Sequence, residues 1–337
     1  MSEKEELMNI RDLSVEYKTR LGQVSAVDHV SFDIHKGEIL GLVGESGCGK
    51  STMGKALMRM IQPPGKITSG QIIFNGEDIM TYDQNQMRGF RGNKVSMIFQ
   101  DPMTSLNPVQ RVDEHVIEAI QVHEPKTKAD AALGRAETLI QKLGIQKRRM
   151  NSYPHQLSGG MRQRVMVGLG LVLNANLIIA DEATTSLDVI VEAKLADQLR
   201  DIREEFGVSL LVITHNIALV AELSDRVAVM YAGHVVEIGD VEPIFDDPLH
   251  PYTKGLLDSI PTIKLNEKEE LYKMPGEPPN LTHPPSGCRF HPRCPFAMPI
   301  CSNQEPSLKE VSPGRLVKCW LFSEHAIKAY PSVEVSS

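Results

Sequence analysis

One stretch constrains the fold of this chain more than any other, and its sequence is Gly44-Glu45-Ser46-Gly47-Cys48-Gly49-Lys50-Ser51-Thr52. It follows the apolar run at 39–43 and precedes a helix-forming run at 53–60. The pattern G-x-x-x-x-G-K-[ST] between a strand and a helix is typical of a phosphate-binding loop. Its glycines let backbone N–H groups turn inward around phosphates, and the helix N-terminus adds a positive dipole end. We therefore expect a nucleotide site, with Lys50 on the β- and γ-phosphates and Ser51 on Mg²⁺.

The length and charge of the chain limit what it can be. Its 337 residues, 41% of them apolar, allow one large domain with a smaller one, or two of moderate size. The net charge of −7 provides no basic field for nucleic-acid binding. The N-terminus lacks the pattern of a signal peptide, and no apolar run approaches the roughly 20 residues of a membrane span. We expect a cytoplasmic protein that reaches a membrane only through partners.

Periodicity predicts an α/β core with two additions. Alternating apolar and polar residues at 7–17 and 24–34 predict an antiparallel β flap. Apolar runs alternating with helical patterns predict a mainly parallel sheet that is covered on both faces. Further strands are expected at 71–74, 95–99, 177–182, 209–214 and 227–231, and helices at 190–206 and 217–224. Helical patterns at 112–122, 130–143 and 160–173 predict a helical subdomain inserted at about 104–175.

The composition changes from about residue 261, where proline becomes frequent and clear helix or strand periodicity disappears. We place a domain boundary near 260. Residues 1–260 then form the main domain, and 261–337 form a linker (261–284) and a Cys-rich extension. Four of the five cysteines lie in that extension: Cys288, Cys294, Cys301 and Cys319. The fifth, Cys48, is expected to act as a small residue of the phosphate loop.

Two stretches carry polar groups suited to nucleotide chemistry. Asp181-Glu182 closes an apolar strand, so the first acid can hold Mg²⁺ and the second can act as general base. The alternative is a pair of acids that only caps the strand. Ser158 is expected to be the N-cap of the next helix, and Gly159-Gly160 leave its N-terminus open to an anion. Taken alone, that stretch is better explained as a capped helix with a flexible entry.

Three single residues are weaker candidates. Gln100 and His215 each follow a predicted strand, at the sheet edge where ligands bind in open α/β folds. A lone histidine is more often structural than catalytic. Tyr17 ends the first predicted strand, where it would either stack on an adenine ring or serve as an ordinary strand aromatic.

The order of these motifs over residues 7–260 resembles the ATP-binding subunits of ABC transporters. The order is phosphate loop, Gln100, Leu157-Ser158-Gly159-Gly160, Asp181-Glu182, Ser186-Leu187-Asp188 and His215. The resemblance implies a P-loop ATPase that uses Mg²⁺ and converts ATP and water to ADP and phosphate. Two positions depart from the common pattern, since Met161 replaces a Gln and Ala183 replaces a Pro. Met161 is frequent in the peptide-transport branch, and neither change removes a site residue.

The resemblance also implies a role for each motif within one chain. Residues 44–52 would hold the phosphates, and Tyr17 would stack on adenine. The metal ligands would be Ser51, Gln100 and Asp181. Glu182 would be the catalytic base, and His215 would contact the γ-phosphate and position the attacking water.

A second set of motifs would act on another chain. Ser158 and Gly160, with Gly159 between them, would contact the γ-phosphate of ATP bound to the opposite subunit, and Asp188 would communicate across the interface. A phosphate loop and a helix N-terminus from separate subdomains cannot easily share one nucleotide within a chain. We therefore expect two ATP molecules held between two such domains, in a homodimer or, as the resemblance favours, a heterodimer.

Further motifs are similar to the peptide and nickel permease branch. They are the segments 100–108 and 153–164, His250-Pro251-Tyr252-Thr253, and Cys288-Arg289-Phe290-His291-Pro292-Arg293-Cys294-Pro295. This branch implies the ATPase of a dipeptide or oligopeptide importer at the cytoplasmic face of the membrane. Its partners would be two transmembrane permease subunits and, indirectly, an extracytoplasmic peptide-binding protein. Related nickel and oligosaccharide importers share much of the pattern and remain alternatives.

The tail cysteines have the spacing C-x₅-C-x₆-C-x₁₇-C, which lacks the close pairs of zinc fingers. Four thiolates at this spacing suit an iron–sulfur cluster, and the resemblance implies [4Fe–4S]. Zinc and four reduced cysteines without metal are the alternatives. Because so small and proline-rich a tail has little core of its own, a metal would help to stabilise it.

Two rival functions would use the same phosphate loop. One is a soluble ABC ATPase that acts on DNA or ribosomes, but the chain has a single ATPase module, no heptad run and a negative net charge. The other is a regulatory subunit that binds ATP without hydrolysing it. The presence of Glu182 and His215 counts against that reading.

Overall fold

The computed structural model describes residues 5–20, 22–99, 106–182, 189–259 and 274–323, and the chain divides into two compact units. The first unit comprises residues up to 7, 34–39 and 75–213. The second comprises 8–33, 40–74 and the chain from 214 onward. Gln100 and Asp188, both predicted site residues, lie outside the described residues, and the domain boundary near 260 stays a prediction.

In the first unit, three short strands form a parallel sheet. They are β6 (Val95–Ile98), β7 (Leu177–Asp181) and β8 (Ser209–Ile213), with β7 in the centre. Val95 pairs with Leu177, and Leu177 pairs with Ser209. Every residue of the three strands is buried, which explains why their sequences are continuous apolar runs. The parallel sheet predicted from these runs is confirmed.

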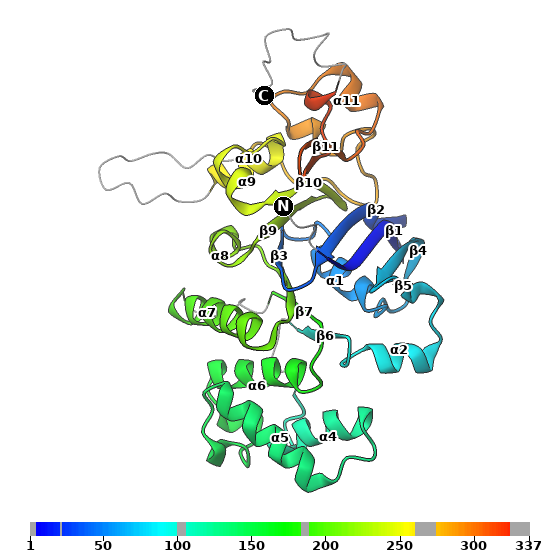
Figure 1. The fold of residues 1–337 in the computed structure, drawn as a ribbon. Helices are drawn as coiled ribbons and strands as arrows, with labels where there is room; N and C mark the ends of the chain where they lie inside the picture. The colour runs from blue at the N-terminus through cyan, green and yellow to red at the C-terminus, as the bar shows by residue number, and fades with distance from the viewer. Residues whose placement is uncertain (1–4, 21, 100–105, 183–188, 260–273, 324–337) are drawn as a thin grey trace, which may run out of the picture. The chain divides into compact units, whose positions relative to one another are not determined.

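The first unit also contains the predicted helices. They are α4 (Val112–His123), α5 (Ala129–Lys142), α6 (Gly159–Leu171) and α7 (Val189–Phe206). Figure 1 shows α4, α5 and α6 gathered into one group, as expected for a helical subdomain. In α4 the buried apolar residues Val112, Val116 and Ile120 recur at helical spacing. This unit also contains β5 (Glu77–Asp78) and α2 (Gln84–Phe90).

The second unit contains the predicted β flap. Its strands are β1 (Glu6–Thr19), β2 (Gly22–His35) and β4 (Gly65–Phe74), with β1 in the middle. β1 and β4 are antiparallel, and Met8 pairs with Phe74. The flap predicted from alternating polarity is confirmed. The strand predicted at 71–74 is the apolar end of β4, which begins six residues earlier.

The other sheet of this unit has the strand order β11-β12-β10-β9-β3. β3 (Ile39–Val43) and β9 (Arg226–Tyr231) are parallel, whereas β10 (His234–Asp240) returns antiparallel to β9. Helix α1 (Lys50–Leu57) follows the phosphate loop, and α8 (Ile217–Leu223) precedes β9. Helices α9 (Val241–Asp246) and α10 (Pro251–Asp258) follow β10.

The extension contains regular structure that its sequence did not indicate. Strands β11 (Lys309–Ser312) and β12 (Arg315–Val317) form a hairpin, and β12 pairs with β10, so the tail adds to the sheet. A short helix, α11 (Pro299–Asn303), precedes them. The sequence shows no clear helix or strand periodicity after 261, yet 299–317 contains a helix and two strands. Strands of three or four residues are too short to show a period of two.

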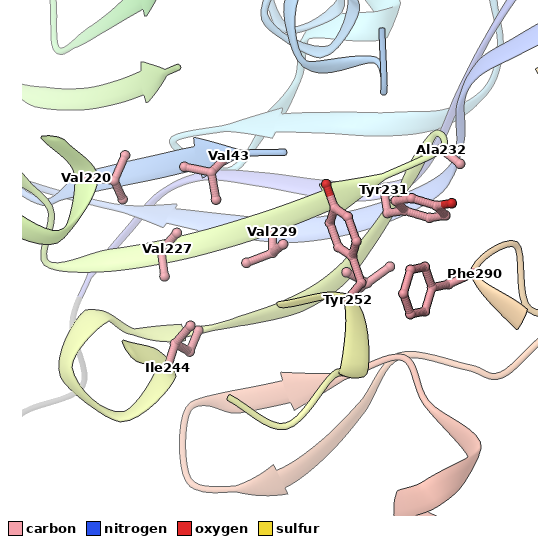
Figure 2. Packing of buried hydrophobic residues seen from close by; sticks show 10 residues of the cluster. Val43, Val220, Val227, Val229, Tyr231, Ala232, Ile244, Tyr252 and Phe290 are labelled. Carbon is pink, nitrogen blue, oxygen red and sulfur yellow. The ribbon is translucent and has the colours of Figure 1, made fainter. Parts of the chain in front are cut away.

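One aromatic residue of the extension, Phe290, packs into the core of the same unit. Phe290 is buried in a cluster with Tyr231 and Tyr252, beside β9 and α10 (Figure 2). The ring centroid of Phe290 lies 5.2 Å from that of Tyr231, edge to face, and 5.5 Å from that of Tyr252. The tail thus shares the apolar core of the sheet, and it adds a small cluster of its own in which Met298 and Cys301 pack with Ile300, Trp320 and Leu321. Among the described residues, no helix has both the length and the apolarity needed to cross a bilayer.

We predict that Phe290→Ala lowers the free energy of unfolding by about 3–5 kcal/mol, because it empties a buried aromatic site. Phe296 is the matched control, since it lies in the same tail but is 55% exposed against 2% for Phe290. Phe296→Ala should change stability by about 0.5 kcal/mol or less. Urea denaturation of both variants checks this, and equal losses would contradict the packing described above.

Candidate functional site

The phosphate loop has the backbone that its glycines predict. Gly44, Gly47 and Gly49 all have positive φ, and helix α1 begins directly after Gly49. A Cβ on Gly49 would lie 2.1 Å from the Ala26 carbonyl oxygen, so only glycine fits this approach between the loop and β2. The loop therefore presents its backbone at the N-terminus of a helix, as an anion site requires.

Lys50 and Cys48 lie on the inner side of this loop. Lys50 is buried, and its ammonium group donates hydrogen bonds to the carbonyl oxygens of Gly44 (2.8 Å) and Glu45 (3.1 Å). The Sγ atom of Cys48 is 3.9 Å from Lys50 Nζ. Burial raises the pKa of the Cys48 thiol, which agrees with its expected role as a small neutral residue.

Glu45 is held by residues that the sequence did not connect to the loop. Its carboxylate accepts hydrogen bonds from Arg293 Nη1 (2.8 Å) and Nη2 (3.0 Å), and its backbone N–H donates to Tyr252 Oη (2.9 Å). Hydrogen bonding to Glu45 raises the pKa of Arg293 above its ordinary value. The motifs around Tyr252 and Arg293 were visible in the sequence, but only as family markers.

A second arginine of the extension binds the β9–β10 turn, which contacts the phosphate loop. Arg289 donates to the carbonyl of Ala232, in the β9–β10 turn, and forms an ion pair with Asp28 of β2. The next residue of that turn, Gly233, donates its N–H to the carbonyl of Cys48 at 2.9 Å. The ring of His234, whose Nε2 lies 3.4 Å from the Asp28 carboxylate, is the main cause that lowers the pKa of Asp28 to about 2, and the charge of Arg289 is a smaller cause.

The predicted acids lie in the other unit, at the end of β7. Asp181 is buried as the last residue of the strand. Glu182 follows with a φ of 46°, a left-handed backbone conformation that is uncommon outside glycine, and its N–H donates to the Ile213 carbonyl at 2.8 Å. Such conformations are concentrated at functional sites, which supports Glu182 as more than a strand cap.

Ser158 is the N-cap of α6, as predicted, and its hydroxyl accepts a hydrogen bond from the Met161 N–H at 3.4 Å. Ser158 and Gly159 are exposed, and no atom lies within 4 Å of a Cβ built on Gly159 or Gly160. The helix N-terminus is thus open, as the sequence suggested.

The remaining candidates are placed as follows. His215 is exposed directly after buried Thr214, next to Asn216, which caps α8. Tyr17 is half-buried in β1 and pairs with Gly65, where a Cβ would lie 2.5 Å from its ring. The absence of a side chain at Gly65 therefore makes room for the ring, but adenine stacking by Tyr17 stays a prediction.

The four tail cysteines are free thiols. The backbone N–H of Cys288 donates to the Cys301 carbonyl at 2.8 Å, which brings the first and third cysteines together. Burial raises the pKa of Cys288 to about 11 and that of Cys319 to about 12. Four thiols in one small subdomain have the donor chemistry of a sulfur-ligated group. Within the described ranges, however, no three His, Cys, Asp or Glu side chains are grouped to hold a metal ion.

Two family models match separate parts of the chain. Residues 27–185 match the family model described as ABC transporter. Residues 236–301 match the one described as oligopeptide/dipeptide transporter, C-terminal region. The second match includes Tyr252 and Arg293, the two residues that hold Glu45.

Relatives match almost the whole chain. The oligopeptide transport ATP-binding protein OppD of Bacillus subtilis is 45% identical over 334 residues, covering 98% of this chain and 93% of that protein. The dipeptide transport ATP-binding protein DppD of the same organism is 43% identical over 329 residues, covering 96% and 98%. OppD of Escherichia coli is 44% identical over 315 residues, covering 93% of each.

Solved structures show the same fold. A dimeric ATP-binding cassette in a post-hydrolysis state with ADP and phosphate has a TM-score of 0.62 and 26% identity, covering 70% of this chain and 99% of its own. CbiO1 from Clostridium perfringens, part of the ABC transporter complex CbiONQ, has a TM-score of 0.62 and 25% identity, covering 72% of this chain and 92% of its own. The P-loop cassette fold inferred from the motifs is therefore confirmed.

Proposed function

The chain belongs to the ABC transporter ATP-binding proteins, and we propose that it hydrolyses ATP to drive uptake of dipeptides or oligopeptides through membrane partners. One observation carries the peptide assignment. The similarity to peptide-transport ATP-binding proteins extends through the C-terminal extension and covers 98% of the chain in the case of OppD. Nickel and oligosaccharides are the alternative substrates.

The ATP-binding half of the mechanism uses residues 44–52. The inward-facing backbone of the loop and the N-terminus of α1 bind the phosphates. Lys50 moves its ammonium from the carbonyl oxygens of Gly44 and Glu45 to the β- and γ-phosphates, because an anion competes well for a cation that neutral carbonyls now hold. Ser51 supplies a hydroxyl ligand to Mg²⁺, with Gln100 as a second ligand.

The hydrolytic half uses the end of β7. Buried Asp181 supports the metal, and Glu182 accepts a proton from the attacking water. The left-handed backbone at Glu182 turns the chain immediately after the strand, so the two acids serve different partners. His215 contacts the γ-phosphate and orients the water. Hydrolysis then proceeds by in-line attack on the γ-phosphorus, which gives ADP and inorganic phosphate.

The site is completed by a second ATPase subunit. The open N-terminus of α6, with Ser158 as its cap, is suited to the γ-phosphate of a nucleotide on another chain. Asp188 communicates across that interface. The dimer is either two copies of this chain or a pair with a different ATPase, and a pair of different subunits is the arrangement we favour.

The energised complex works at the cytoplasmic face of the membrane. Two transmembrane permease subunits dock on the ATPase pair and carry the peptide, which an extracytoplasmic binding protein delivers. Since the residues that the structure describes include no membrane-crossing helix, attachment through such partners accounts for a membrane role of this chain.

The extension binds a [4Fe–4S] cluster through Cys288, Cys294, Cys301 and Cys319, with zinc as the alternative. Free thiols and the backbone link between Cys288 and Cys301 support this proposal. Burial raises the pKa of Cys288 and of Cys319, so metal loading must release the protons of these thiols. The group would hold the loops of the tail together, and no catalytic step depends on it.

We predict that Glu182→Gln lowers ATP turnover by about 10²–10⁴-fold, because the general base is lost while the shape of the side chain is kept. ATP binding should persist, and ATP should hold the variant as a dimer, since hydrolysis no longer releases it. Phosphate release and size-exclusion chromatography with Mg-ATP measure both effects. Wild-type turnover in the variant would contradict the role of Glu182, and turnover absent from the wild type would favour the regulatory-subunit reading.

The transporter assignment predicts that the native complex contains membrane subunits. Isolation of the tagged chain from detergent-solubilised membranes should recover two permease subunits and a second ATPase. Peptide added with the extracytoplasmic binding protein should increase ATP turnover of that complex, whereas nickel or an oligosaccharide should not. Recovery with duplex DNA or ribosomes and without any membrane subunit would reject the transporter assignment.

The cluster proposal predicts about four iron atoms per chain and visible absorption in protein prepared without oxygen. Cys301→Ser should abolish both. Cys48→Ser is the matched control, because Cys48 is buried in the phosphate loop and should leave the iron content unchanged. One equivalent of zinc without visible absorption would replace the iron assignment by zinc.

A further inference from the structure

Two motifs of the peptide-transporter branch have no role in the hydrolysis described above. They are the segment 250–253, at the start of α10, and the segment 288–294, in the Cys-rich extension. Tyr252 of the first segment and Arg293 of the second each form a hydrogen bond with Glu45 of the phosphate loop. All of these residues belong to the second unit.

Arg293 donates a hydrogen bond from each of its two terminal nitrogens to the carboxylate of Glu45. The two hydrogen bonds, at 2.8 and 3.0 Å, join separate nitrogens to separate oxygens, which is the bidentate geometry of the strongest ion pairs. The Arg293 side chain is 5% exposed and that of Glu45 is 25% exposed. Arg293 is itself fixed, because Nε donates to the Pro275 carbonyl at 2.9 Å and Nη1 to Tyr231 Oη at 3.3 Å.

Tyr252 fixes the backbone of the same residue. Its hydroxyl accepts the Glu45 N–H at 2.9 Å, and its ring is fully buried. The ring is held between Tyr231, at a centroid distance of 4.5 Å, and Phe290, at 5.5 Å (Figure 2). The main chain and side chain of Glu45 are therefore both bound to rigid groups of the tail and of α10.

These contacts bear on nucleotide binding in two ways. Glu45 follows Gly44 directly, so fixing it pre-orders the loop and reduces the entropy lost when phosphates bind. Glu45 is also a negative charge within a loop that must accept a triphosphate. The guanidinium group of Arg293 neutralises that charge and holds the carboxylate in place.

We propose that Arg293 is a positioning residue of the nucleotide site, through which the C-terminal extension holds the phosphate loop ready for ATP. The inference rests on the proposed function in one respect, that residues 44–52 bind ATP. It adds that the extension, besides holding the four cysteines, orders the phosphate loop for ATP binding.

The test measures binding of Mg-ATP to the full-length chain by calorimetry, and the ATP dependence of turnover. We expect Arg293→Gln to raise the Kd and KM for ATP about tenfold, because one charge-assisted bidentate pair is lost. The kcat at saturating ATP should stay within about twofold of wild type, since Arg293 does not touch the reacting atoms. Arg293→Lys keeps the charge without the bidentate geometry and should give an intermediate Kd.

Arg315→Gln is the matched control. Arg315 lies on β12, and its Nη2 donates to Glu237 of β10 at 2.9 Å, so it is also a buried ion pair between the extension and the sheet. Its loss should lower the melting temperature as the loss of Arg293 does, while leaving the Kd for ATP unchanged. An equal rise of the Kd in both variants would show a general loosening of the tail and would overturn the proposal.

A double variant tests whether Arg293 acts through Glu45. If it does, Glu45→Gln combined with Arg293→Gln binds ATP no more weakly than Arg293→Gln alone. Additive weakening would overturn the inference, as would a Kd for Arg293→Gln within twofold of wild type. A wild-type chain that does not bind ATP would instead refute the proposed function, so the two failures are distinguishable.

Discussion

The ion pair between Arg293 and Glu45 connects the last described segment of the chain to its phosphate loop. A loop that turns its N–H groups toward an anion can use few of them for hydrogen bonds within the loop, so neighbouring residues must hold its outer side. Here those neighbours are Arg293, Tyr252 and the Gly233 N–H, which bonds the Cys48 carbonyl. The nucleotide site thus depends on packing that begins some two hundred residues further along the chain.

The same packing explains how so small an extension is held in place. Phe290 is buried against Tyr231 and Tyr252, and β12 continues the sheet beyond β10. The two arginines of the cysteine segment, Arg289 and Arg293, reach past this aromatic cluster to charged partners. Burial of apolar side chains fixes the position of the extension. From that position, Arg293 binds Glu45 of the phosphate loop and Arg289 binds the β9–β10 turn beside it. A metal in the tail would add to this arrangement without replacing it.

Much of the fold and of the site could be predicted from the sequence. The core strands, the helices of the inserted subdomain, the glycine requirement of the loop and the Ser158 cap all follow from local rules of period, sterics and capping. The hairpin of the extension could not be predicted, because its strands are too short to carry a period. The left-handed backbone of Glu182 had no local signal, since surrounding packing imposes it.

The sequence by itself therefore determined which residues we propose for phosphate, metal and water, because each of these tasks demands a residue type at a fixed spacing within a few positions. The tertiary structure alone decided what holds those residues in place. Glu45, Tyr252 and Arg293 are far apart in the chain, and each is unremarkable in its own segment. Their hydrogen bonds exist only because β3, α10 and the extension are packed around one aromatic cluster. Contacts of this kind follow from three-dimensional packing, for which local spacing carries no information.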